Sequence, residues 1–179
     1  TPTSSQATGP STTQIPACPS SVSTPLFDTL PIAPGDFLAF RPLGFLSPPI
    51  HMFPAKHSAF SMTPPGATAT PRPVRAPGRV WVKEIWEARF STGGANYQVF
   101  VYPCSDVRVY FGHVATIADR LMTELGTRAP SCNSFNDGSS MVTTCRYENM
   151  SLPLESGELM GTGPDSAGVD FGVADFRLP

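Results

Sequence analysis

Residues 80–114 read VWVKEIWEARFSTGGANYQVFVYPCSDVRVYFGHV and predict three successive β-strands. The first of them alternates only in part between apolar and polar residues. The second, NYQVFVY, alternates cleanly and places Tyr97, Val99 and Val101 on one side. The intervening segment STGGAN (91–96) carries the glycines typical of a hairpin turn. This region therefore predicts an antiparallel β-sheet.

The segment ATIADRLMTELG (115–126) has the one clear helical pattern. Ile117, Leu121 and Leu125 recur at spacings of four residues, and Gly126 is a natural stop at the C-terminal end. After this segment the chain returns to short strand-like and turn-like pieces. The sequence predicts a mainly β fold, an antiparallel β-sheet or sandwich with one short helix at about residues 115–126.

Residues 1–25 are dominated by Ser, Thr and Pro and contain no charged side chain. We predict that they form an N-terminal arm or linker without a core of its own, followed by a single β-rich domain over residues 26–179. The chain begins at Thr1 without Met and without an apolar leader, so any signal peptide has been removed or lies outside this numbering.

The charge balance excludes some classes of partner. Charged residues make up 15% of the chain, and 12 Lys+Arg against 14 Asp+Glu leave a net charge of −2. Because there is no basic excess and no Lys/Arg cluster, nucleic-acid binding is not expected. No apolar run reaches the length of about 18 residues that a transmembrane helix needs, so no transmembrane segment is expected.

The four cysteines are Cys18, Cys104, Cys132 and Cys145, and none forms a C-x-x-C pair. An even number of cysteines in a Ser/Thr/Pro-rich chain favours two disulfides and a secreted, periplasmic or cell-surface location. Of the three possible pairings we favour Cys132–Cys145, which are close in sequence, together with Cys18–Cys104, which would tie the arm to the domain. The alternative is four buried free thiols.

The histidines and one aspartate are the candidate functional residues. The chain has three histidines, of which His51 and His57 lie within HMFPAKH and His113 follows Gly112. Gly112 lets another group approach the backbone closely. Asp170 interrupts an apolar strand-like run, where a carboxylate is costly unless it is paired or bound to a metal. The alternative for each histidine is an ordinary hydrogen-bonded structural residue.

Other catalytic patterns are missing from the sequence. It contains no G-x-S-x-G, no H-E-x-x-H and no phosphate-binding glycine-rich loop. Trp81, Trp86 and Phe90 are candidates for an exposed aromatic platform that binds carbohydrate, but their spacing is more typical of a core.

Five motifs resemble, in order, those of the lysostaphin-like zinc endopeptidases, which cut peptidoglycan cross-bridges. They are RPVRAPGRVWVKEI (72–85), NYQVFV (96–101), VYFGHVATI (109–117), SLPLESGELMGTG (151–163) and GVDFGVAD (168–175). The resemblance covers about residues 44–177. It implies a sandwich-like β-sheet with a shallow groove, in which His51 or His57, His113 and Asp170 come together on one face.

The active-site positions diverge from those of the family. His113 matches one catalytic histidine, whereas Gly168 stands at the position of the other and Asp170 at that of a metal-binding histidine. Lys56 stands where the family's first metal motif would place a carboxylate. The resemblance therefore implies a peptidase-like fold with an altered site.

From this resemblance we expect His51, His57, Asp170 and His113 to bind one divalent metal, with His113 either a ligand or a catalytic group that stabilises an oxyanion. Zinc is the first expectation, with copper, nickel or iron as alternatives. Such a metal with an open position activates water for hydrolysis.

Two functions remain open from the sequence. One is a secreted metal-dependent hydrolase that acts on a cell-wall peptide or another extended extracellular polymer. The other is a non-catalytic binding or regulatory module that keeps the peptidase-like fold. The clustering of the histidines favours the first, and the glycine at position 168 favours the second.

Overall fold

The computed structural model describes residues 14–21, 23–49, 52–62, 72–164 and 168–178. Within these ranges the fold is mainly β, with antiparallel sheets and one helix, as the sequence predicts. None of the described helices is long and apolar enough to cross a membrane.

The described residues form one large and one small sheet. The main sheet has nine strands, in the spatial order β1 (Ala39–Arg41), β2 (Ser58–Ser61), β12 (Gly168–Asp175), β6 (Val107–Val114), β5 (Ala95–Cys104), β4 (Val80–Phe90), β9 (Met141–Tyr147) and β8 (Ser131–Asn136), with β10 (Leu152–Leu154) pairing with β4. The small sheet has the order β3 (Pro73–Arg75), β11 (Leu159–Thr162) and β7 (Thr116–Ile117), and helix α1 spans Asp119–Gly126.

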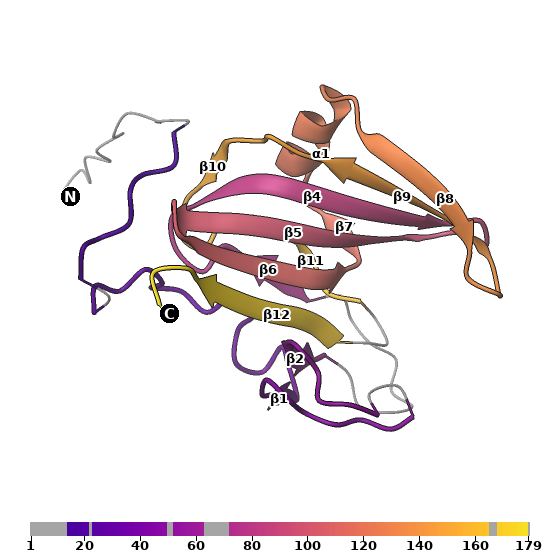
Figure 1. Cartoon of the computed structure of the whole chain (residues 1–179), viewed down its shortest axis with the longest axis horizontal. Helices are drawn as coiled ribbons and strands as arrows, with labels where there is room; N and C mark the ends of the chain where they lie inside the picture. The colour runs from indigo at the N-terminus through magenta and orange to yellow at the C-terminus, as the bar shows by residue number, and fades with distance from the viewer. Residues whose placement is uncertain (1–13, 22, 50–51, 63–71, 165–167, 179) are drawn as a thin grey trace, which may run out of the picture.

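The hydrophobic core lies between the main sheet and the layer formed by the small sheet and α1. In Figure 1, β7 and β11 pass behind the long strands of the main sheet. Alternate side chains of β4, β5, β6 and β12 point into this core, among them Ile85, Val99, Val101, Phe111 and Val169, all fully buried. The intervening side chains therefore lie on the opposite side of the main sheet, which we call the open face.

The predicted hairpin at the centre of the sheet is confirmed. β4 and β5 pair antiparallel, and Gly93 and Gly94 in the connecting turn have φ of 101° and 87°. Only glycine adopts such angles without steric cost, which explains the glycine pair. A register shift between Val82 and Glu84 changes the alternation of β4 and accounts for its irregular sequence pattern.

The helix begins later than predicted. Thr116 and Ile117 are extended, because they pair with Thr162 and Gly161 of β11, and Ala118 remains extended with ψ of 151°. The spacing of Ile117, Leu121 and Leu125 suggested one helix because all three side chains are buried in the core. Ile117, however, reaches the core from strand β7 and not from the helix. Hydrogen bonds to β11 thus take the place of the first predicted helical turn.

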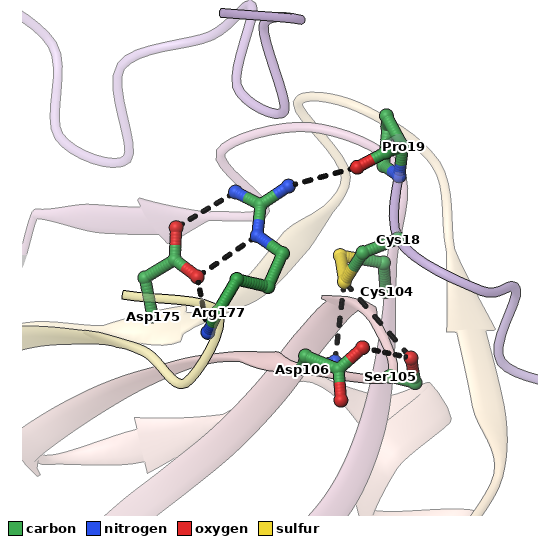
Figure 2. The surroundings of a disulfide bond; sticks show 7 residues. All are labelled: Cys18, Pro19, Cys104, Ser105, Asp106, Asp175 and Arg177. Atoms are coloured by element: carbon green, nitrogen blue, oxygen red, sulfur yellow. Dashed lines mark hydrogen bonds and ion pairs between the residues drawn. A yellow bond between two sulfur atoms is a disulfide. The ribbon is translucent and has the colours of Figure 1, made fainter. Parts of the chain in front are cut away.

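Both predicted disulfides are present, and no described cysteine is free. Cys132 and Cys145 lie directly opposite each other on β8 and β9. Cys18 joins the N-terminal arm to Cys104 at the end of β5 (Figure 2).

A second interaction holds the arm beside the C-terminus. The guanidinium of Arg177 pairs with the carboxylate of Asp175 at 2.7 Å and donates a hydrogen bond to the carbonyl of Pro19 at 3.2 Å (Figure 2). The arm, the β5–β6 turn and the C-terminal strand are thereby joined at one end of the main sheet.

One carboxylate, that of Glu87, lies on the core side of β4 and is only 7% exposed. It accepts hydrogen bonds from Arg89 at 2.7 Å and from the hydroxyls of Tyr97 at 3.2 Å and Tyr147 at 3.3 Å. The Arg89 guanidinium lowers the pKa of Glu87, although burial acts in the opposite direction. Burial raises the pKa of Tyr97 to about 12, so this hydroxyl remains a donor.

Removing the two disulfides should have unequal effects on stability. Cys18–Cys104 closes a loop with a sequence separation of 86, and Cys132–Cys145 one of 13. By loop entropy, replacing the first pair with Ala should cost about 4–5 kcal/mol and the second about 3 kcal/mol. Thermal unfolding of the two double variants checks this, and equal or reversed losses would contradict it.

Titration of the denatured, unreduced protein should find almost no free thiol.

Glu87→Gln should destabilise the protein and weaken its acid sensitivity. The folded-state pKa of Glu87 lies below the ordinary value of 4.5, so its contribution is complete above that pH and is lost as the pH falls through the lowered value. At neutral pH we expect a loss of about 1–3 kcal/mol, measured by denaturant unfolding. Glu148→Gln, at an exposed position just after the neighbouring strand β9, is the control and should change neither quantity. Equal effects of the two substitutions would contradict the prediction.

Candidate functional site

The candidate site is centred on Asp170 of β12, on the open face. Its neighbour Val169 is fully buried in the core, so strand alternation directs Asp170 the other way. Asp170 lies opposite Gly112 of β6, where an added Cβ would be 3.0 Å from the Asp170 Cβ and 3.3 Å from Oδ2. The predicted close approach to Gly112 is therefore made by the Asp170 side chain.

Two histidines flank the Asp170 carboxylate. Nδ1 of His57 lies 3.2 Å from Oδ1, and Nε2 of His113 lies 3.4 Å from Oδ2. The side chains of His57 and Asp170 are 16% and 18% exposed, whereas that of His113 is 53% exposed. We call these three residues the His–Asp–His network.

The neighbours of each ring determine which nitrogen carries the proton. The Asn96 amide donates to Nδ1 of His113 at 2.9 Å, so Nε2 carries the hydrogen and faces Oδ2 of Asp170 at 3.4 Å. Nδ1 of His57 faces two acceptors, the Asp170 carboxylate and the Ser58 carbonyl at 3.2 Å, and is therefore a donor as well. One ring nitrogen thus faces each oxygen of the Asp170 carboxylate.

Of the four predicted metal ligands, the structure brings three into contact, and His51 lies outside the described residues. Among the residues described, however, no group of three or more His, Cys, Asp or Glu is arranged to hold a metal ion. The protonated nitrogens of His57 and His113 face the carboxylate, whereas a metal needs their lone pairs. In this arrangement the described residues do not fit the predicted ion.

Position 168 has a steric reason for being glycine. A Cβ on Gly168 would lie 2.8 Å from the carbonyl oxygen of Phe60 in the neighbouring strand β2. Because a backbone atom rather than a flexible side chain occupies that space, β2 would have to shift to admit a histidine there. The close packing of β12 on β2 therefore explains why glycine, and not the histidine of the resembled motif, stands at position 168.

A groove of about 410 Å³ adjoins the network along β12 and β6. Its lining includes the cations Lys56 and Arg108, Tyr110 and the apolar residues Leu43 and Ala174. Sequence reasoning missed Arg108 and Tyr110. The available signal was alternation, since both occupy the positions of β6 between buried Val107, Val109 and Phe111.

Aromatic and cationic side chains cover the open face next to the groove. Trp86 and Phe100 are in contact, with ring centroids 5.2 Å apart. The Arg146 guanidinium lies 4.1 Å from the Trp86 ring, and that of Arg108 lies 5.8 Å from Phe100. Of the predicted aromatic platform, Trp86 belongs to this face, whereas Trp81 is 4% exposed and is buried as the core interpretation expects.

No family model, no curated protein and no solved structure matches this chain. The resemblance to lysostaphin-like endopeptidases therefore rests on the sequence motifs alone.

Gly112→Ala should disrupt the His–Asp–His network. The added methyl group would push against Asp170, so the N–H donors of His57 and His113 lose the geometry of their acceptor. Imidazole ¹⁵N–¹H NMR spectra should show shifted signals for both rings, with assignments from single His→Gln variants. Gly126→Ala is the matched control, because a Cβ there meets nothing within 4 Å. Unchanged spectra in Gly112→Ala would contradict the contact.

Proposed function

We propose that this protein is a non-catalytic binding module that holds an extracellular peptide in the groove on the open face of its main sheet. This corresponds to the second of the two functions considered from the sequence. The proposal retains a peptidase-like fold as the origin of the site and assigns recognition, not cleavage, to it.

The observation that carries the proposal is the groove of about 410 Å³ along β12 and β6. Ligand sites are concave, mostly apolar and supplied with a few convergent polar groups. Here the apolar residues Leu43 and Ala174 combine with Arg108, Lys56 and Tyr110. The groove opens onto a sheet face that carries the ring pair Trp86 and Phe100, and Arg108 stacks on Phe100; aromatic residues and arginine are favoured at recognition surfaces.

The geometry beside the groove favours binding over catalysis. His57 and His113 each direct an N–H at Asp170, so the carboxylate is occupied in orienting two rings. Position 168 has no room for the second catalytic histidine of the resembled family. The network therefore stabilises one wall of the groove.

The proposed compartment is extracellular. Two disulfides join Cys18 to Cys104 and Cys132 to Cys145, and such bonds persist in oxidising compartments. A secreted or cell-surface location would expose the open face to extracellular peptides.

A metal-dependent hydrolase is the second candidate, and one observation favours it. The donor atoms of His57 and His113 lie 3.2 Å and 3.4 Å from the oxygens of Asp170. Ligand atoms of one tetrahedral zinc ion are separated by about 3.3 Å when each lies about 2.0–2.1 Å from the metal. A rearrangement that turns lone pairs toward a common point would be required.

Blocking the groove should abolish peptide retention. The probe is a synthetic library of random seven-residue peptides, incubated with purified protein and analysed by affinity-selection mass spectrometry. Ala174 lines the groove, so Ala174→Trp places a large side chain in it. The lost apolar contact should reduce the amount of peptide retained at least about tenfold. Ala88→Trp, on the main sheet but not in the groove lining, is the matched control. Equal retention by both variants would contradict the proposal.

The same samples separate the two candidate functions. A binding module returns the retained peptides intact, with or without added zinc. One metal ion per chain in protein purified without an affinity tag, together with cleaved peptides that disappear in Asp170→Asn, would replace the proposal with the metal-dependent hydrolase.

A further inference from the structure

Arg108 is held in a defined orientation at the groove. Its guanidinium lies 5.8 Å from the ring centroid of Phe100 and 5.7 Å from that of Phe176. Stacking between aromatic rings restrains a guanidinium while leaving the N–H groups at its edge available. The side chain is therefore prepared to bind a planar anion with little further loss of conformational freedom.

The two cations of the groove differ from most arginines of this protein. Within the described ranges, carboxylates pair with Arg72, Arg79, Arg89, Arg120, Arg128 and Arg177. Neither Arg108 nor Lys56 has an ion-pair partner among those residues, although both line the same groove. In a chain of net charge −2, this local positive charge is not a general property of the surface.

Tyr110 adds a neutral donor to the same groove. Its ring lies over Gly172, where an added Cβ would be 2.1 Å from a ring carbon. Burial raises the pKa of Tyr110, and the nearby Asp170 carboxylate raises it further. The hydroxyl thus stays protonated and can donate a hydrogen bond to an anionic ligand.

The walls of the groove are apolar. Leu43 is 69% exposed and Ala174 is half-buried, and both line the groove on the same face of the sheet as Arg108. Leaving such side chains in water costs free energy that an apolar ligand group recovers. The volume of about 410 Å³ accommodates one or two amino-acid residues.

We infer that the groove holds the carboxy-terminal residue of a peptide, with its free carboxylate against Arg108 and Lys56 and an apolar last side chain against the groove walls. The inference rests on the proposed binding function and names the end of the peptide that the groove selects. A terminal residue carries a carboxylate and an apolar side chain on one Cα, which matches cations and apolar walls in one small groove. An internal Asp or Glu supplies the charge without the apolar group.

The test compares free acids with amides. Two synthetic libraries of seven-residue peptides are used, random at six positions and ending in Leu, Val or Phe, one with free carboxylates and one amidated. The wild-type protein should retain the free acids at least about tenfold better, because charge-assisted hydrogen bonds are lost on amidation.

Arg108→Gln should remove this preference. Arg146→Gln is the matched control, because Arg146 also stacks on an aromatic ring, Trp86 at 4.1 Å, but does not line the groove. Tyr110→Phe is a milder variant that keeps the ring over Gly172 and should weaken retention of the acids about threefold. Thermal unfolding of each variant establishes that it is folded, and Tyr110→Phe carries the test if Arg108→Gln does not fold.

Each outcome separates this inference from the proposed function. Preference for acids that is lost in Arg108→Gln and kept in Arg146→Gln supports the inference. Equal retention of acids and amides, abolished by Ala174→Trp, overturns the inference and leaves the binding function standing. Preference for acids that persists in both Arg108→Gln and Tyr110→Phe overturns the assignment to this groove. Retention of neither library overturns both proposals.

Discussion

The antiparallel ladder between β12 and β6 joins the C-terminal strand to the central strands of the main sheet, and the arrangement of the site depends on it. Its register sets Asp170 against Gly112 and Gly172 against Tyr110. In both pairs a side chain lies across a glycine of the neighbouring strand, so a larger residue at either position would require that side chain to move. A shift of the register by one residue would turn Val169 to the open face and Asp170 into the core.

Charged side chains have different surroundings on the two sides of the main sheet. In the core, Glu87 is enclosed by Arg89 and two tyrosine hydroxyls, which satisfy the carboxylate locally. On the open face, Arg108 lies against the rings of Phe100 and Phe176 without an ion-pair partner among the described residues. Buried charge must be paired to be tolerated, whereas charge at a solvated surface can stay available for a ligand. The first arrangement serves stability, and the second is the basis of the proposed recognition.

The His–Asp–His network shows how the same residue types support different chemistry in different orientations. Two imidazoles and a carboxylate within 3.4 Å form a common metal donor set, but the Asn96 amide and the Ser58 carbonyl direct the N–H of each ring toward Asp170. A hydrogen-bonded carboxylate of this kind orients its neighbours and lends rigidity to the wall of the groove. The steric limit at Gly168 acts in the same direction, because it removes a position from which another histidine would reach the site.

The sequence by itself determined the mainly β fold class, because strand alternation is a local signal. It favoured the observed disulfide pairing, since the closeness of Cys132 and Cys145 left Cys18 and Cys104 as the second pair, and its scarce histidines indicated the candidate site. Alternation placed Tyr97, Val99 and Val101 on one side of β5, and they are buried together. Only the tertiary structure decided that Ile117 lies in a strand, since Gly161, the residue opposite it in the sheet, is distant in the sequence. The groove likewise joins residues near position 43, on β6 and on β12, and no local pattern reports which side chains of separate strands meet. Ring orientation at His113 depended on Asn96, a contact formed only when β5 and β6 pair.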